Sequence, residues 1–259
     1  MILRVLLPFF IILSLSAKET QSPAKIIMKI EAGLYLPDAS GSISNPFGSS
    51  SFQDDYGYSD LKASYFSLET TFDYDYVPNL YLSYFNMKDN KDAYLNRAVE
   101  VGENNFNSSV TTDINYNVLS AVLYQDFKVK GEYFMLFSKP QYSGDIEFDI
   151  GMNVKLIDWT FNIKKDNFSD GWIKVNQFVA LPYLGFKYYF YDLIVYGNIS
   201  TLALNKVESS AYQIGVDYMI VEDLYLSVSY IDEHFEIVED RDTVDFDTSG
   251  YKLSFKYRF

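Results

Sequence analysis

Most of this chain alternates apolar and polar residues with a period of two. The clearest stretch is 146–156, where every second residue is apolar and the residues between include Glu147, Asp149 and Lys155. Successive side chains of a β-strand point to opposite faces, so each such stretch predicts a strand with one apolar and one polar face. We count about ten stretches, with limits of about eight and twelve. The sequence therefore predicts an all-β fold of up-and-down antiparallel strands.

The connections between these strands are of two kinds. Short turns and longer stretches rich in Ser, Asn, Gly and Asp alternate along the chain, the short ones at 77–79, 191–192 and 221–223 and the long ones at 37–61, 87–111 and 239–244. This asymmetry is typical of an outer-membrane β-barrel. We expect loops in the long stretches, a short helix within 87–105, and the short turns and both termini in the periplasm. Two connections depart from the rule, because 205–206 is short and 128–144 is long.

The first 17 residues have the features of a secretory signal peptide. Arg4 precedes the uncharged run 5–17, which ends in small residues and predicts cleavage after Ala17. That run would span about 20 Å as a helix, too little for a hydrocarbon core about 30 Å thick. No later segment is long and apolar enough for a membrane helix. We therefore predict an exported chain with one barrel domain at 18–259.

Composition narrows the functional classes. The formal charge is −14, which opposes binding to phosphate backbones and excludes a nucleic-acid partner. Cysteine is absent, so disulfides, thiolate chemistry and a lipidated N-terminal cysteine are excluded. Aromatic residues make up 18% of the chain, with 24 Tyr and 21 Phe. An aromatic excess suits a barrel with aromatic girdles at both membrane interfaces.

A soluble barrel also alternates, with its apolar residues inside and its charges outside. The inverted arrangement of a membrane barrel is favoured by aromatic residues near strand ends and by Gly and Ser on the opposite face. These aromatic residues are Tyr74, Tyr76, Tyr188, Tyr189, Tyr218 and Tyr230. The last strand decides between the two, because it would be an aggregation hazard as the edge of a soluble sheet. Its apolar positions are Tyr251, Leu253, Phe255, Tyr257 and Phe259.

This last strand resembles the C-terminal signal by which the barrel-assembly machinery recognises bacterial outer-membrane barrels. More widely, the chain resembles a small family of Gram-negative outer-membrane β-barrel proteins of uncharacterised function. The resemblance rests on Glu31-Ala32-Gly33, Ser40-Gly41, Pro78-Asn79-Leu80, Gly151 and the terminal strand. It implies a location in the outer membrane, with membrane lipid and lipopolysaccharide as partners beside the assembly machinery. It transfers no functional residue.

A barrel of about ten strands has a narrow interior. Nine charged residues are predicted to face it: Lys29, Glu31, Glu147, Asp149, Lys155, Asp217, Lys252, Lys256 and Arg258. Buried charges are costly unless they pair, so we expect these side chains to pair across the lumen and to plug it. The sequence therefore favours a structural or narrow-channel role. A loop-mediated adhesin, using 37–61, is the alternative.

Candidates for catalysis are few, and we predict no enzyme, cofactor or metal site. The single histidine, His234, is flanked by acids, and an omptin-like barrel protease would use such a pair with a second acidic pair. Asp73 and Asp75 have the spacing of that second pair, but they flank the turn at 77–79 and so belong to the opposite end. A phospholipase-like barrel would need Ser and His together on one strand, and the sequence has no such pair.

The stretch 232–247 holds eight acidic residues and one base, Arg241. Oxygen-rich loops favour divalent cations, which would also bridge to lipopolysaccharide. A solvated acidic loop is the favoured interpretation, because the Asp-x-Asp-x-Asp-Gly pattern of a calcium loop is missing.

Overall fold

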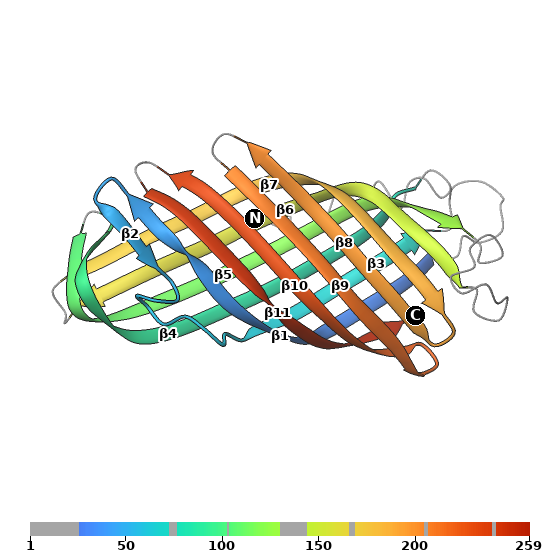
Figure 1. Ribbon diagram of the computed structural model, residues 1–259. Coiled ribbons are helices and arrows are strands. Elements are labelled where there is room, and N and C mark those ends of the chain that lie inside the picture. Colours follow the sequence, from blue (N-terminus) through green and yellow to red (C-terminus); the bar gives the residue numbers. More distant parts are fainter. Residues whose placement is uncertain are drawn as a thin grey trace.

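The computed structural model describes residues 26–72, 77–102, 104–129, 144–165, 169–204, 207–239 and 242–259 (Figure 1). These residues form eleven antiparallel strands and contain no helix long and apolar enough to cross a membrane. The strands are β1 (Ile26–Asn45), β2 (Gly48–Ser51), β3 (Ala63–Phe72), β4 (Asn79–Val101), β5 (Asn104–Val129), β6 (Asp145–Lys165), β7 (Ser169–Phe190), β8 (Leu193–Leu204), β9 (Val207–Val221), β10 (Leu224–Glu239) and β11 (Asp242–Arg258).

Ten of these strands close into a ring. Each strand from β3 to β11 pairs with the next, β3 pairs with β1, and β1 pairs with β11 from Lys29↔Arg258 to Ser44↔Thr243. The four-residue β2 is a side arm, paired with the far end of β1. The predicted barrel of about ten up-and-down strands is confirmed.

The two ends of the barrel differ. At the short-turn end lie the C-terminus and the turns at 191–192 and 222–223, in which Tyr191 and Asp223 adopt positive φ. Such left-handed residues are common in tight hairpins, whose twist they match. At the opposite, long-hairpin end, β4–β5 and β6–β7 extend far beyond the short strands (Figure 1).

An apolar band surrounds the barrel at its short-turn half. On β6 the outward residues Phe148, Ile150, Met152 and Leu156 are exposed, while Glu147 and Lys155 point inward and are buried. The five apolar residues of the terminal strand are also exposed, including Tyr251 at 66% and Phe259 at 62%. A closed ring leaves no unpaired edge in lipid, so this half is the membrane-spanning part of an outer-membrane β-barrel. The predicted fold class and location therefore stand.

Beyond the band the same strands continue with the polarity of their faces exchanged. On β6 the outward residues become Asp158, Thr160 and Asn162, and the inward residues become Trp159 and Phe161, both fully buried. The wall there is polar outside and apolar inside, as in a soluble barrel. The long-hairpin half is thus a water-exposed extension with a hydrophobic core.

This extension overturns part of the loop prediction. Stretch 87–111 belongs to β4 and β5, which meet at Gly102 with φ 62°, so the short helix expected within 87–105 is wrong. The expected loop 37–61 is partly strand, and in 239–244 β10 runs to Glu239 and β11 begins at Asp242. Outward Asn, Ser and Thr made these strands look like loops, although outside lipid a strand needs no apolar outer face. Most of 128–144, the connection at 205–206 and the signal peptide lie outside the described residues.

Candidate functional site in the barrel lumen

The structure places all nine predicted lumen charges on inward positions of β1, β6, β9 and β11. Eight of them are well shielded, with Lys252 and Asp149 almost fully buried. Arg258 differs, because its side chain is 42% exposed at the short-turn end and its Nε donates to Asp223 Oδ1 at 2.7 Å. It lies at the mouth of the lumen and not within the network that fills it.

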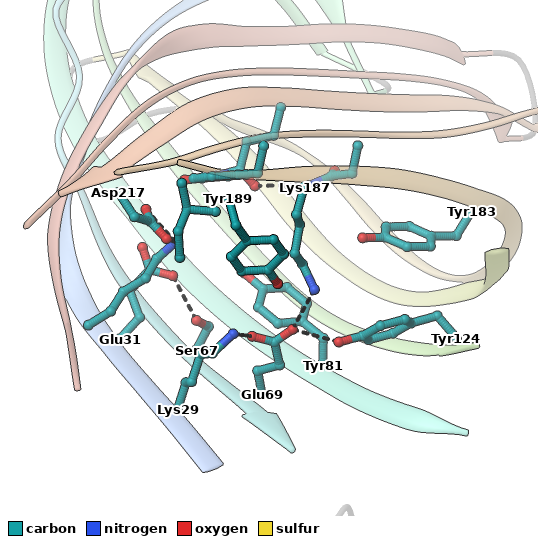
Figure 2. Close-up of a pocket in the computed structure, with 15 residues that line it drawn as sticks. Lys29, Glu31, Ser67, Glu69, Tyr81, Tyr124, Tyr183, Lys187, Tyr189 and Asp217 are labelled. Carbon is teal, nitrogen blue, oxygen red and sulfur yellow. Dashed lines mark hydrogen bonds and ion pairs between the residues drawn. The ribbon is translucent and has the colours of Figure 1, made fainter. Parts of the chain in front are cut away.

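The largest ion network is centred on Lys187 of β7, which the sequence analysis missed (Figure 2). Its Nζ lies 2.8 Å from Glu147, 3.0 Å from Glu69 and 3.3 Å from Asp149. The sequence analysis also missed Glu69. Its Oε2 lies 2.9 Å from Lys29 Nζ, and its Oε1 accepts a hydrogen bond from the Tyr124 hydroxyl. Both missed residues occupy inward positions of predicted strands, so period-two phasing could have identified them.

A second network joins β1, β3, β9 and β11. Glu31 Oε1 lies 2.6 Å from Lys252 Nζ. The Glu31 carboxylate also accepts hydrogen bonds from the hydroxyls of Ser67, at 2.9 Å, and of Ser254. Lys256 binds Asp217 at 2.8 Å and lies 4.3 Å from the centre of the Tyr196 ring. These are the charge-assisted and cation–π contacts that make buried charges tolerable.

A third pair marks the boundary between the two halves. Lys155 Nζ lies 3.0 Å from Glu233 Oε1, and the Tyr116 hydroxyl donates to the other oxygen of Glu233 at 3.4 Å. Glu233 belongs to the acidic stretch that was expected as a loop, yet β10 directs it into the lumen. Beyond this pair, toward the long-hairpin end, the lumen is lined mostly by apolar side chains.

Cavities lie along the lumen. A mouth of about 540 Å³ opens at the short-turn end, lined by Lys128, Glu147 and Arg258 among others. Deeper cavities of about 80 Å³ and 60 Å³ lie at the ion networks. A buried water needs roughly 10–15 Å³ of such space, so each deeper cavity has room for about four to eight waters.

Aromatic side chains fill the lumen of the long-hairpin half. Phe52, Trp159 and Phe246 pack together with ring centres 5.2–5.7 Å apart, and Tyr56 packs on Phe161 at 4.9 Å. Phe52 and Tyr56 come from stretch 37–61, which was expected to form an exposed loop. Burial raises the pKa of Tyr56 to about 12, although its hydroxyl is bonded to Ser50. Part of the aromatic excess of the sequence thus fills this half, while other rings, such as Phe148 and Tyr251, are exposed on the outer surface.

The tips of three hairpins meet above this core. The Asn45 side chain at the β1–β2 tip donates to the Glu100 carbonyl of β4 and to Asp242 of β11, at 3.2 Å each. Arg97 of β4 donates to the Ser49 carbonyl at 2.7 Å and to Asp55 at 3.0 Å. These contacts hold the tips against one another over the aromatic core.

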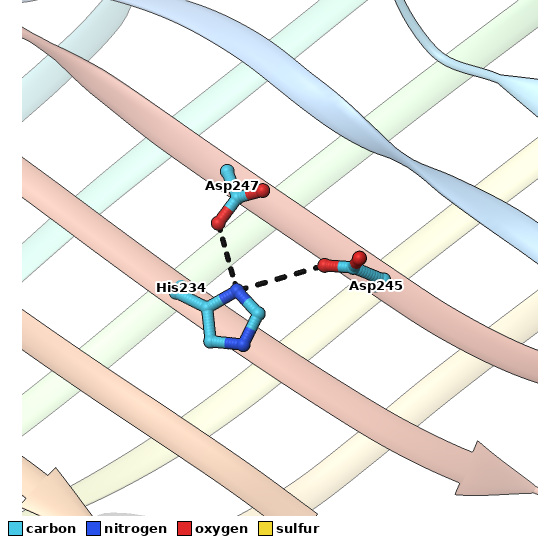
Figure 3. A group of neighbouring side chains, drawn as sticks. All are labelled: His234, Asp245 and Asp247. Atoms are coloured by element: carbon cyan, nitrogen blue, oxygen red, sulfur yellow. Dashed lines mark hydrogen bonds and ion pairs between the residues drawn. The ribbon is translucent and has the colours of Figure 1, made fainter.

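His234 lies on the outer wall and not in the lumen (Figure 3). Its Nδ1 is 2.7 Å from Asp247 and 3.6 Å from Asp245, and the three side chains could each offer one ligand to a metal ion. Burial and the neighbouring Asp247 carboxylate raise the pKa of Asp245. The acidic stretch is therefore mostly strand, split between the outer wall and the lumen, and not the predicted loop. The acidic pair Asp73–Asp75 lies outside the described residues.

No protein-family model and no curated protein sequence matches this chain. Among solved structures, the chain is similar to the outer membrane protease OmpT from Escherichia coli, with 10% identity, 94% of this chain and 100% of that chain covered, and a TM-score of 0.48. It is similar to the translocator domain of the autotransporter NalP from Neisseria meningitidis, with 10% identity, coverage of 96% and 95%, and a TM-score of 0.40. It is also similar to Neisserial surface protein A, with 12% identity, 92% of this chain and 100% of that chain covered, and a TM-score of 0.36.

Proposed function

We propose that this protein is a sealed, non-enzymatic structural barrel of the outer membrane. One observation carries the proposal: the lumen is filled twice, by paired charges in the membrane half and by aromatic side chains in the long-hairpin half. The two fillings rest on different interactions, ion pairs in one half and packed rings in the other. A wide aqueous pore would need 16 or more strands, and this ring has ten.

The proposal includes an orientation. The short-turn end faces the periplasm and the long-hairpin end faces the exterior, as in barrels with short periplasmic turns. The outward residues Tyr251, Leu253, Phe255, Tyr257 and Phe259 are then available to the assembly machinery before they enter lipid. Membrane lipid and lipopolysaccharide are the lasting partners.

Conductance in planar lipid bilayers tests the seal. We expect wild-type protein to give small or absent currents. A double variant, Trp159→Ala with Phe161→Ala, removes two of the core rings and should raise the current, since the packing that closes the long-hairpin half is then incomplete. Lys128→Ala, at the open mouth, is the matched control and should change little. Large, steady currents from the wild type would refute the sealed barrel and make a channel the better proposal.

The structure gives less support to the two alternatives. Phe52, Tyr56 and Tyr58 of stretch 37–61, the candidate adhesive loop, are buried in the core, while Phe47 is 70% exposed. His234 lies on the outer wall of the barrel, and its ion contacts in the described part of the chain are with Asp245 and Asp247.

A further inference from the structure

The outer wall of β4–β7 carries two rows of polar side chains directly beyond the apolar band. Cross-strand partners define the rows, and the last apolar row is Tyr84, Leu119, Leu156 and Phe178. The first polar row is Asn86, Asn117, Asp158 and Asn176, and the second is Lys88, Asn115, Thr160 and Lys174. Rows lie about 6.7 Å apart along the tilted strands, so the first residues beyond the last apolar row of each strand enter the headgroup layer, which is roughly 5–8 Å deep on each side of a bilayer.

Lys88 and Lys174 are the only bases in these two rows. Both are exposed, and within the described part of the chain neither forms an ion pair. This differs from the lysines of the lumen, which are bound to carboxylates. The two lysines stand three strand spacings apart, about 14 Å measured across the strands.

The wall formed by β9, β10, β11 and β1 has the opposite charge directly beyond its own last apolar row. Its first two rows are Tyr212, Asp232, Ser249 and Asp38, followed by Ser210, His234, Asp247 and Ser40. These rows hold three carboxylates and no Lys or Arg. The β4–β7 rows hold two lysines and the single carboxylate of Asp158. The lysines and carboxylates of these rows therefore sum to +1 on the β4–β7 wall and to −3 on the other wall.

We propose that the β4–β7 wall docks the phosphorylated sugar headgroup of lipopolysaccharide, with Lys88 and Lys174 as phosphate ligands. Asn86, Asn117 and Asn176 supply hydrogen bonds in the row below. Trp172, 64% exposed on β7 and next to Lys174 along the outer face, offers a ring face to the sugar. The headgroup avoids the acidic wall, so lipid is ordered on one side of the barrel. This inference rests on the proposed orientation, which places the rows in the outer leaflet.

Binding of lipid A to the folded full-length protein in detergent tests the docking wall. The probes are lipid A with two phosphates and lipid A with one, with identical acyl chains. We expect Lys88→Gln with Lys174→Gln to bind the bisphosphorylated form about tenfold more weakly than wild type, the size expected for two exposed charge contacts. The control, Asp38→Asn with Asp232→Asn, changes as many charges on the other wall and should bind at least as well as wild type. Unchanged electrophoretic mobility without boiling verifies that each variant is folded.

Equal binding by the lysine variant and wild type, or an equal loss in the control, would overturn the docking wall. A separate experiment checks the orientation, using the absence of native cysteine. Tyr94→Cys at the long-hairpin end should react with a membrane-impermeant maleimide on intact cells, and Glu222→Cys at the short-turn end should not. The reverse result would overturn both the orientation and outer-leaflet docking, whatever the binding assay shows.

Discussion

The two halves of β6 are built from the same alternation and have opposite insides. From Glu147 to Lys155 the odd-numbered residues turn charged or small side chains into the lumen, and from Ile157 to Ile163 they turn apolar ones. The strand does not shift its register, because its pairing with β5 and β7 is continuous across the change. What changes is the solvent outside, from lipid to water. Alternation therefore shows that two faces exist, and the outer solvent decides which of them is apolar.

The two halves fill the lumen in different ways, because the solvent outside each half decides which residues its outer face can carry. The membrane half places its apolar residues against lipid and must fill its interior with polar groups, which are stable only when paired. The long-hairpin half exposes polar residues and can bury aromatic rings as any soluble domain does. The following variants test this contrast.

The largest effect is expected in the membrane half. Lys187→Met leaves Glu69, Glu147 and Asp149 without their shared cation and should lower the free energy of unfolding by about 3–5 kcal/mol, toward the upper end because three carboxylates lose a partner. Urea titration in lipid vesicles would measure it. Lys128→Met, whose side chain is 68% exposed, should cost at most about 1 kcal/mol. Equal losses would mean that the lumen is hydrated like a surface.

In the long-hairpin half the two tryptophans form a matched pair. Trp159→Ala removes a fully buried ring and should cost about 3–4 kcal/mol, while Trp172→Ala, 64% exposed, should change stability by less than about 0.5 kcal/mol. The same urea titration compares them. A small effect of Trp159→Ala would show that the core of this half is loosely packed.

The outer surfaces can be compared along one strand. Ile150→Arg puts a charge in the apolar band and should cost about 2–4 kcal/mol if the residue lies near the bilayer midplane. Asn162→Arg lies twelve residues further along the same face of β6. It should change the stability very little, because this position faces water. Folding yield in vesicles reports both. Similar yields would place the membrane boundary elsewhere.

The smallest effect concerns the acidic outer wall and depends on pH. The pKa of Asp245 is raised in the folded state, so its contribution to stability is present below the pKa of the unfolded chain and is lost as pH rises through the folded pKa. Asp245→Asn cannot ionise and should be a few tenths of a kcal/mol more stable than wild type at neutral pH. The two should converge in acid. A variant less stable at pH 7 would show that contact with His234 outweighs the repulsion.

The sequence allowed prediction of much of the membrane half and less of the rest. The outward residues of β11 and the inward charges of β1 and β6 followed from alternation. The extension did not, because outward Asn, Ser and Thr of β5 hide the inward series Val110, Ile114 and Tyr116. The partners of Lys187 were also out of reach, since Glu69 lies 118 residues away and their meeting depends on the stagger of the whole ring.

The join between β1 and β11 governs how the chain must fold. It brings together residues that are 223 positions apart, as in the contact of Ser254 with Glu31. Closing so long a loop is slow and entropically costly, and its strand β11 is the last to be synthesised. Before β11 is made, the chain can form only an open sheet, whose two edge strands have unpaired backbone N–H and C=O groups. This topology therefore requires that the open sheet be protected from aggregation until β11 is available. A chain truncated before β11 could not close its ring.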